Sequence, residues 1–543
     1  MTKASSELEA QLLEFRQSCA QSRTEGRVPA PREAGPSMRI ADLATGPADG
    51  TRGKVTIIGA GISGLVAAYE LEQLGYSVEI WEASRRIGGR IHTHRFGSDL
   101  EAPVAELGAM RIPTHHRHTM KYICRLGLAD EVRPFRSLLA EENAFLGDPT
   151  GYVRLSEAPR ALFEELRRGL AQHGYRDETL LFGAQLSLVV NAIAPPAVRE
   201  GLRQDLSRQL LGLADSVDLR PHIRRRQRQR LGDSVAEQID LHAVFAAYPH
   251  LRTACHGDLR SFLDDILVET SSELVRIRGG MSRMVERLAR RIRGPIHCGR
   301  EVVGLDVRPG GVLIQVREGG RIVTHESEYA LCTVPFSVLR RLRLGGFSED
   351  KLDAIRTVQY VPATKVAFHC KEPFWLWEGI SGGASAGGGL IRQTYYPCID
   401  GDPALGAVLL ASYTIGEDAD TLGRMSPEAR NAYVLTELGK MHPALLRPGM
   451  VMGAVSAAWG QHRWSSGGCS VRWGKDTAAV EEERARVTEP QGALFFAGEH
   501  CSSAPAWIDG AIESAIDAVG RIVQYDTPAQ RTRMVREAVS HSA

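Results

Sequence analysis

The stretch KVTIIGAGISGLVAAYELEQLGYSVEIWEAS, residues 54–84, decides the fold. An apolar strand leads into Gly59, Gly61 and Gly64, an amphipathic helix follows, and a second strand ends at Glu82. In this order the first glycine permits a tight turn, the second lets a pyrophosphate approach the backbone, and the third lets helix and strand pack closely. The helix N-terminus attracts phosphate, and a carboxylate at the end of the second strand accepts a hydrogen bond from a ribose hydroxyl. The stretch therefore predicts a Rossmann-type dinucleotide-binding unit.

A second glycine motif follows this unit closely. Residues 85–94 read RRIGGRIHTH, which places Arg86, Gly88, Gly89 and Arg90 shortly after the acidic residue. With this motif the chain resembles the flavin amine oxidase superfamily, whose members carry a glycine pair and an arginine beside the FAD pyrophosphate. The resemblance implies FAD as the cofactor, with Arg90 neutralising phosphate charge. Without the preceding motif, two exposed arginines around a turn would be the simpler interpretation.

The C-terminal part of the sequence supports the same family. Residues 495–516, FFAGEHCSSAPAWIDGAIESAI, resemble its closing motif. By this resemblance Gly498 and Glu499 approach the ribityl chain, and the helix that begins near Trp507 and Ile508 faces the isoalloxazine. Val302, in REVVGL, stands where the family holds the adenine through a backbone contact, although an ordinary strand valine explains it equally well.

The choice of substrate depends on a group that binds a carboxylate. The run ELGAMRIP, residues 106–113, resembles the segment of L-amino acid oxidases in which an arginine holds the substrate α-carboxylate. Arg111 takes that place, after Gly108, Ala109 and Met110, which we expect beside the cofactor. A guanidinium suits the task because its fork gives two parallel charge-assisted hydrogen bonds. The alternative is a surface salt bridge, which the small and apolar neighbours disfavour.

Four further residues are expected around the substrate by the same resemblance. Tyr396 in IRQTYYPCID is expected to place its hydroxyl on the carboxylate, with Tyr395 as the alternative, because adjacent side chains of a strand point to opposite faces. Lys365, in ATKVAFHC, is expected near flavin N5, where a cation stabilises developing negative charge; a solvent-exposed strand edge is its alternative. Trp507 is expected to wall the pocket, and Ala506 stands where many relatives have glycine.

Cys469, in SSGGCSV, has a position like that of the cysteine joined to flavin in monoamine oxidases. Amino acid oxidases usually hold FAD noncovalently, and a buried cysteine is the commoner state of such a residue. We therefore expect noncovalent FAD and keep a thioether as the alternative. No general base is identified, since His242 and His500 are candidates only by residue type.

The resemblance implies an L-amino acid oxidase. Hydride would pass from Cα to flavin N5, and dioxygen would reoxidise the flavin and be released as hydrogen peroxide. The imine would hydrolyse to a 2-oxo acid and ammonia. The alternatives are an L-amino acid 2-monooxygenase, a monoamine or polyamine oxidase, and a flavin-binding scaffold without turnover. The side chain that is accepted stays open, because the helical region carries no matching motif.

The expected fold class is α/β, with a discontinuous Rossmann-type FAD-binding domain, a mixed α+β substrate-binding domain and a helical domain. The expected boundaries are an N-terminal extension and linker at 1–50, FAD-binding segments at 51–118, 274–344 and 488–525, a mainly helical domain at 119–273, a substrate-binding domain at 345–487 and a C-terminal tail at 526–543. The basic run HIRRRQRQR, residues 222–230, is expected as a solvated loop or helix face, with a processing site as the alternative.

Composition excludes several other classes of protein. The 543 residues carry 66 basic and 65 acidic side chains, so no global field points to nucleic acid or to an acidic membrane. Nine cysteines are scattered without a Cys-x-x-Cys pair, which suggests neither a metal site nor a disulfide framework. The N-terminal residues lack an apolar targeting segment, and no apolar run is long enough to span a bilayer. We expect a cytoplasmic homodimer.

Overall fold

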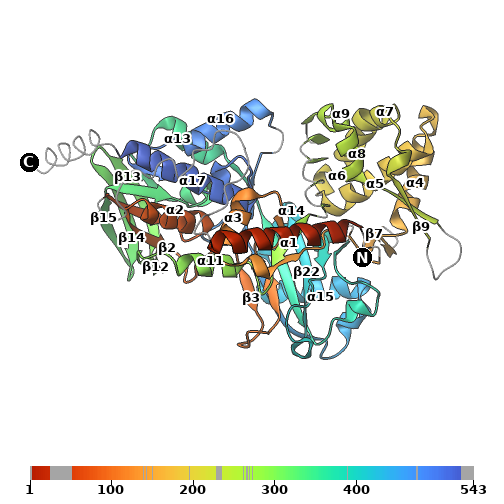
Figure 1. The fold of residues 1–543 in the computed structure, drawn as a ribbon, viewed down its shortest axis with the longest axis horizontal. Helices are drawn as coiled ribbons and strands as arrows, with labels where there is room; N and C mark the ends of the chain where they lie inside the picture. Colours follow the sequence, from red (N-terminus) through yellow and green to blue (C-terminus); the bar gives the residue numbers. More distant parts are fainter. Residues whose placement is uncertain are drawn as a thin grey trace, which may run out of the picture.

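The computed structural model describes residues 3–24 and 52–526, apart from 139, 142, 149–150, 195, 228–234, 258, 261, 264–266, 268–269, 272, 388 and 473–474. The expected linker and almost all of the C-terminal tail lie outside these residues. Figure 1 shows a sheet-and-helix unit on the left and a separate group of helices on the right. A second sheet lies between them, toward the bottom of the view. None of the described helices combines the length and the apolar composition that a bilayer crossing requires.

The first unit is built on a five-stranded parallel sheet in the order β12-β2-β1-β16-β25. Its strands come from distant parts of the chain, as the sequence predicts for a discontinuous domain: β1 (Lys54–Ile58), β2 (Ser77–Glu82), β12 (Ile296–Cys298), β16 (Tyr329–Cys332) and β25 (Leu494–Phe496). Helix α2 (Ile62–Gln73) packs beside α17 (Ile508–Tyr525). The two expected nucleotide motifs therefore meet in one layer although more than 400 residues separate them.

Smaller elements complete this unit. A four-stranded sheet contains β13 (Glu301–Arg308), β14 (Gly311–Glu318), β15 (Arg321–Ser327) and β17 (Arg343–Gly345). The remaining helices are α3 (Arg117–Arg125), α11 (Ser282–Ala289), α12 (Phe336–Leu339), α13 (Glu349–Thr357) and α16 (Thr477–Thr488). Short pairings join β3 (Thr93–Arg95) to β4 (Val104–Glu106), β11 (Leu274–Ile277) to β5 (Ile112–Pro113) and β6 (Val132–Pro134), and β18 (Gln359–Val361) to β24 (Cys469–Val471).

The second unit is a seven-stranded sheet in the order β23-β19-β22-β21-β20-β7-β8. Its strands are β23 (Val451–Ala458), β19 (Ala363–Cys370), β22 (Ala407–Ile415), β21 (Gln393–Tyr395), β20 (Ala384–Ala386), β7 (Phe145–Asp148) and β8 (Gly151–Arg154). Neighbours are antiparallel except β20 and β7. Helices α14 (Glu417–Arg424) and α15 (Pro427–Met441) pack on it. The expected sheet from residues 345–487 is present. It also contains β7 and β8, which come from the region expected to be mainly helical.

The third unit is helical, as expected, and has its own apolar core. It contains α4 (Ala158–Gly169), α5 (Asp177–Ile193), α6 (Pro196–Asp205), α7 (Leu211–Ala214), α8 (Leu241–Ala247) and α9 (Pro249–Thr253). Between α7 and α8 the chain forms an antiparallel pair of strands, β9 (Ile223–Gln227) and β10 (Val235–Ile239). The expectation of a loop or helix face is therefore wrong for residues 223–227, because they pair as a strand, whereas residues 228–230 lie outside the described part of the chain.

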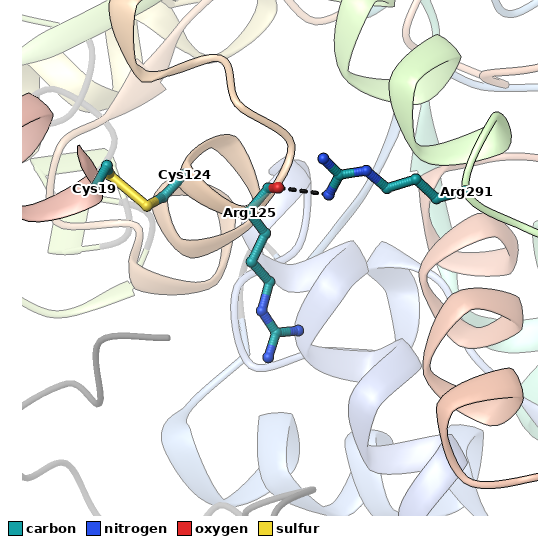
Figure 2. Close-up of a disulfide and its surroundings, with 4 residues drawn as sticks. All are labelled: Cys19, Cys124, Arg125 and Arg291. Carbon is teal, nitrogen blue, oxygen red and sulfur yellow. Dashed lines mark hydrogen bonds between the residues drawn. A yellow bond between two sulfur atoms is a disulfide. The ribbon is translucent and has the colours of Figure 1, made fainter. Parts of the chain in front are cut away.

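The N-terminal extension forms the helix α1 (Lys3–Thr24), whose residues Leu8 and Leu12 are buried in the core of the first unit. Near its end, Cys19 forms a disulfide with Cys124 of α3 (Figure 2). The expectation that the cysteines form no disulfides is therefore wrong for this pair. Spacing alone did not reveal the bond because its two partners stand 105 residues apart.

Candidate active site

A cavity of about 890 Å³ connects the three units. Its walls contain most of the residues that the sequence singles out: Gly59, Gly61, Glu82, Arg90, Gly108, Ala109, Met110, Arg111, Val302, Lys365, Gly498, Glu499, Ala506, Trp507 and Ile508. Two of the expected residues, Gly64 and Tyr396, are not among the residues that line it. Segments that are far apart in the sequence are thus gathered around one elongated space.

The first glycine motif has the geometry that a dinucleotide requires. Gly59 has φ +105°, and a Cβ at Gly64 would lie 2.0 Å from the Gly59 carbonyl oxygen, so Gly64 is needed for helix packing rather than for ligand contact. Gly61 caps α2 and has no atom within 4 Å of the place of a Cβ, which leaves the helix N-terminus open to the cavity. The backbone therefore fits a pyrophosphate at this end.

Glu82 is held firmly at the edge of the cavity. Its two carboxylate oxygens accept hydrogen bonds from the backbone N–H groups of Ala60 and Ser84, each at 2.8 Å. These bonds fix the carboxylate at the end of β2, directly beside the glycine turn. A ribose hydroxyl donating to either oxygen would complete the expected arrangement.

Arg90 and Glu499 join the two nucleotide motifs across the cavity wall. The guanidinium Nη1 of Arg90 lies 2.8 Å from Glu499 Oε1, and the carboxylate also accepts bonds from the Ser470 hydroxyl and the Ala506 N–H. Although burial alone would raise the pKa of Glu499, Arg90, His500 and these donors lower it to about 2. Glu499 is therefore ionised at neutral pH, and it balances the charge of Arg90. A phosphate contact by Arg90 stays a prediction.

Arg111 lies where a substrate carboxylate can reach it. Its side chain is 7% exposed and lines the cavity. Nη1 donates a hydrogen bond to the Tyr395 hydroxyl at 2.9 Å, and this hydroxyl in turn donates to Gln393 Oε1 at 3.1 Å. The surface salt bridge considered as an alternative does not fit this burial. Arg111 and Tyr395 together form a cation beside a hydroxyl, which is a suitable anchor for a planar anion.

Tyr396 points to the other face of the sheet, as alternation along a strand requires. Its buried hydroxyl lies 2.5 Å from Ser385 Oγ and 2.7 Å from His442 Nε2, and His442 Nδ1 meets Glu378 Oε2 at 2.7 Å. The placement of Tyr396 does not fit the role expected for it. The alternative residue, Tyr395, is the tyrosine that meets Arg111, but it is not among the residues that line the cavity either, so its contact with a carboxylate stays a prediction.

Lys365 is buried on β19, between β22 and β23, so a solvent-exposed strand edge does not describe it. Its ammonium donates to the Gly108 carbonyl oxygen at 2.6 Å and lies 4.6 Å from the centre of the Tyr413 ring. These contacts hold the cation at the cavity wall, next to the Gly108–Arg111 segment. The charge is thus available to a group bound in the cavity.

Trp507 and His116 close one side of the cavity. Trp507 precedes α17, and its ring meets the His116 ring edge to face with 5.1 Å between the ring centres. Burial, more than any neighbouring charge, lowers the pKa of His116 to about 4, so its imidazole is neutral at pH 7. Ala506 has φ +69°, a left-handed conformation that glycine adopts without strain. This conformation explains physically why a glycine is favoured at that position.

Four other candidate residues lie as follows. Val302 on β13 and Cys469 on β24 both line the cavity, so an adenine contact and a thioether remain predictions. His500 is buried against Phe336 and Tyr360, and His242 bonds to Thr270 in the helical unit. Neither histidine is among the residues that line the cavity. His116 and His462 are histidines that do line the cavity, and the cluster of three histidines at 115–118 was the signal for His116 in the sequence.

The far end of the cavity is apolar and belongs largely to the helical unit. Its walls include Ile193 of α5, Val198 and Leu202 of α6, Phe262, and Ile415 of β22. Sequence patterns alone did not identify these residues because apolar side chains at helical spacing are equally typical of a core. Arg392 lines the cavity beside them, and its guanidinium donates to the carbonyl oxygens of Ile193 and Ile415.

Comparison with known proteins agrees with this geometry. The model of the flavin containing amine oxidoreductase family matches residues 62–523, so the chain belongs to that family. The chain is 54% identical to the flavin-dependent L-tryptophan oxidase RebO of Lentzea aerocolonigenes, over 87% of its own length and 98% of that protein. It is 28% identical to an L-amino-acid oxidase of Mus musculus, over 86% of its own length and 70% of the relative.

A solved structure shows the same fold. Putrescine oxidase, bound to putrescine, aligns with a TM-score of 0.56 over 87% of this chain and 99% of that one, at 20% identity. The predicted family, the Rossmann-type α/β fold and FAD as the cofactor are therefore confirmed.

Proposed function

We propose that the chain oxidises L-tryptophan, or an L-amino acid with a similarly large aromatic side chain, at its α-carbon. The activity class, an FAD-dependent L-amino acid oxidase, is the one that the sequence predicts, and it agrees with the family and with the named relatives. The observation that carries the proposal is the buried Arg111, which lines the cavity together with a group of apolar residues and donates a hydrogen bond to Tyr395.

The side-chain preference is supported by two independent facts. The relative with 54% identity is named an L-tryptophan oxidase. The apolar end of the cavity contains Ile193, Val198, Leu202, Phe262 and Ile415, which provide the contact area that an indole ring needs. A small substrate such as alanine would leave this end unfilled and would lose the corresponding burial free energy, roughly 25 cal/mol for each Å² of apolar surface.

The chain's own residues bind and orient the substrate. Arg111 and Tyr395 hold the carboxylate, Trp507 forms a wall beside the reacting carbon, and Lys365 provides a fixed cation. FAD, held at the cavity wall, would supply the two-electron acceptor for oxidation at Cα and the route by which dioxygen is reduced to hydrogen peroxide. Because the groups are held in place before the reaction, positioning supplies much of the rate enhancement. Water then hydrolyses the released imine to a 2-oxo acid and ammonia.

Cofactor contacts complete the proposal. The N-terminus of α2 at Gly61 binds the pyrophosphate, and Glu82 accepts a bond from the adenosine ribose. Val302 contacts the adenine, and the segment that begins at Gly498 contacts the ribityl chain. These contacts are supported by the placement of all four residues on the cavity wall. We further propose that the protein acts as a cytoplasmic homodimer, which light scattering coupled to size-exclusion chromatography tests.

Product analysis tests the reaction directly. The holoenzyme is incubated aerobically with L-tryptophan, and peroxide, ammonia, 2-oxo acid, carbon dioxide and amide are measured. Equal amounts of peroxide and 2-oxo acid are expected. Carbon dioxide and the amide as main products would mean that the enzyme is an L-amino acid 2-monooxygenase instead. D-tryptophan is the matched control, and it should give no product above background.

A further inference from the structure

Helix α1 lies outside the segment that matches the family, residues 62–523, yet it is anchored to the folded core. Leu8 and Leu12 are buried in the core of the first unit, and Arg16 donates a hydrogen bond to the Val132 carbonyl oxygen at 2.8 Å. These contacts hold α1 against the core, and α1 also contacts α3 and β6. Docking of α1 therefore places Cys19 beside Cys124.

The two cysteines meet in a small buried cluster. Cys19 is 2% and Cys124 is 7% exposed, and Ala129 and Phe15 pack around them. Their Cα atoms are 5.5 Å apart, which is within the usual range for a disulfide. Figure 2 shows the bond linking the end of α1 to the last turn of α3, so the chain is closed into a loop at this point.

Helix α3 connects the disulfide to the active site. His116, just before its first residue, lines the cavity against Trp507. Thr119 in its first turn donates its backbone N–H and its hydroxyl to Asp509, in the first turn of α17, at 2.7 and 3.0 Å. Eight residues of helix separate His116 from Cys124, about 12 Å along the axis. The disulfide therefore fixes one end of a helix whose other end supports the cavity wall.

Helix α3 also contacts α2, which begins directly after Gly61 and contains Gly64. Arg125 lies 2.6 Å from Glu70 of α2, and the Tyr122 hydroxyl also donates to Glu70. A movement of α3 would thus be transmitted to both α2 and α17. Through α3, α1 is connected to both helices that frame the cofactor end of the cavity.

We propose that Cys19 and Cys124 form a redox-responsive clamp, closed by hydrogen peroxide, that locks α1 onto α3 and thereby stiffens the active-site wall. One thiolate attacks peroxide and becomes a sulfenic acid as water leaves. The second thiol then attacks that sulfur, forms the disulfide and releases a second water. Two thiols are oxidised and one peroxide is reduced to two waters. The source of the peroxide rests on the proposed function, because turnover would release it into the cavity next to His116.

The clamp is tested with peroxide alone. The holoenzyme is reduced with dithiothreitol, desalted without oxygen, exposed to hydrogen peroxide without amino acid, alkylated and digested. A peptide pair joined through Cys19 and Cys124, about 2 Da lighter than the sum of the reduced peptides, is expected. The unfolding midpoint should rise by roughly 5 °C relative to the reduced protein. No crosslink, or a crosslink without any rise in the midpoint, would overturn the proposal.

Variants and a second oxidant make the result specific. Cys19→Ser should lose both the crosslink and the rise in the midpoint, whereas Cys298→Ser, at an exposed thiol on β12, should behave like the wild type. If Cys19→Ser folds poorly, the dithiothreitol-reduced wild type gives the same comparison. In a second arm, L-tryptophan and dioxygen replace the peroxide, and catalase should suppress the crosslink. A crosslink with added peroxide but none with L-tryptophan and dioxygen would refute the enzyme's own turnover as the source of the oxidant. The redox-responsive clamp itself would still be supported.

Discussion

The guanidinium of Arg111 donates a hydrogen bond to the hydroxyl of Tyr395 at 2.9 Å, although 284 residues separate them in sequence. The contact joins the segment after β4 to the last residue of β21, so it connects the cofactor-binding unit to the seven-stranded sheet. Both side chains are buried, and the guanidinium lines the cavity. A carboxylate bound there would meet a cation and a hydroxyl that are already oriented, which lowers the entropic cost of binding.

Replacing Arg111 with lysine tests whether the fork matters in addition to the charge. Lysine keeps the positive charge but cannot form two parallel hydrogen bonds to a carboxylate. We expect kcat/KM for L-tryptophan to fall by about 100-fold, equivalent to about 2.7 kcal/mol. Steady-state kinetics with a peroxide-coupled assay measures this. Arg308→Lys, at an exposed arginine, is the control, and an Arg111→Lys enzyme as active as that control would exclude the carboxylate role.

The two adjacent tyrosines should respond differently to the loss of a hydroxyl. Tyr395→Phe removes the partner of Arg111 and is expected to lower kcat/KM by about tenfold, with unchanged thermal stability. Tyr396→Phe leaves His442 and Ser385 without their shared partner. It should lower the free energy of unfolding by about 1–3 kcal/mol while kcat/KM stays close to that of the wild type. Thermal unfolding and steady-state kinetics on both variants check this. The reverse pattern would mean that Tyr396, and not Tyr395, binds the substrate carboxylate.

A buried carboxyl next to the cavity predicts a pH-dependent stability. Burial raises the pKa of Glu106 from 4.5 to about 7, although the Met281 N–H, the Thr93 hydroxyl, Lys365 and Arg276 act in the opposite direction. The folded state thus binds this proton more tightly than the unfolded chain. The stabilisation that this proton provides is fully present below pH 4.5 and is lost as the pH rises toward 7. The loss in the free energy of unfolding is about 2 kcal/mol.

Glu106→Gln removes this titration while keeping an oxygen that can accept a hydrogen bond. Unfolding midpoints are measured from pH 4.5 to 8 for both proteins. We expect the advantage of the wild type over the variant to shrink steadily across pH 4.5 to 7 and then to level off. Parallel curves for the two proteins would show that Glu106 titrates normally.

Ala506 should tolerate glycine far better than a branched side chain. Its φ of +69° costs an alanine about 1 kcal/mol, which glycine would recover, but glycine also loses about as much through the greater entropy of the unfolded chain. Ala506→Gly should therefore change the free energy of unfolding by less than about 1 kcal/mol. Ala506→Val should be clearly destabilising, because a β-branched residue fits this conformation poorly. Equal unfolding midpoints for the two variants would contradict the backbone argument.

The sequence predicted best what depends on neighbouring residues. The glycines at 59, 61 and 64 and the acid at 82 specify a turn, a helix and two strands within one short segment, and the structure has them where expected. The resemblance at the C-terminus located the second half of the same site. Backbone requirements such as the positive φ at Gly59 are local, and for this reason they are legible in a single sequence.

Features that depend on long-range packing were not accessible in the same way. Alternation predicts that only one of Tyr395 and Tyr396 faces the site, but which of them meets Arg111 depends on the register of β21 against β22. The disulfide between Cys19 and Cys124 depends on how α1 docks. The apolar pocket residues Ile193 and Phe262 belong to a unit whose own core has the same composition.

The most direct test of the central claim, that a buried guanidinium selects a carboxylated amine, compares two molecules with the same indole ring. Oxygen-free holoenzyme is mixed with L-tryptophan or with tryptamine, which lacks only the carboxylate, and the bleaching of the bound flavin is followed by its absorbance. We expect rapid bleaching by L-tryptophan and a rate at least about 100-fold lower with tryptamine. Equal bleaching by both would contradict the claim and would make the enzyme an amine oxidase that does not recognise the carboxylate.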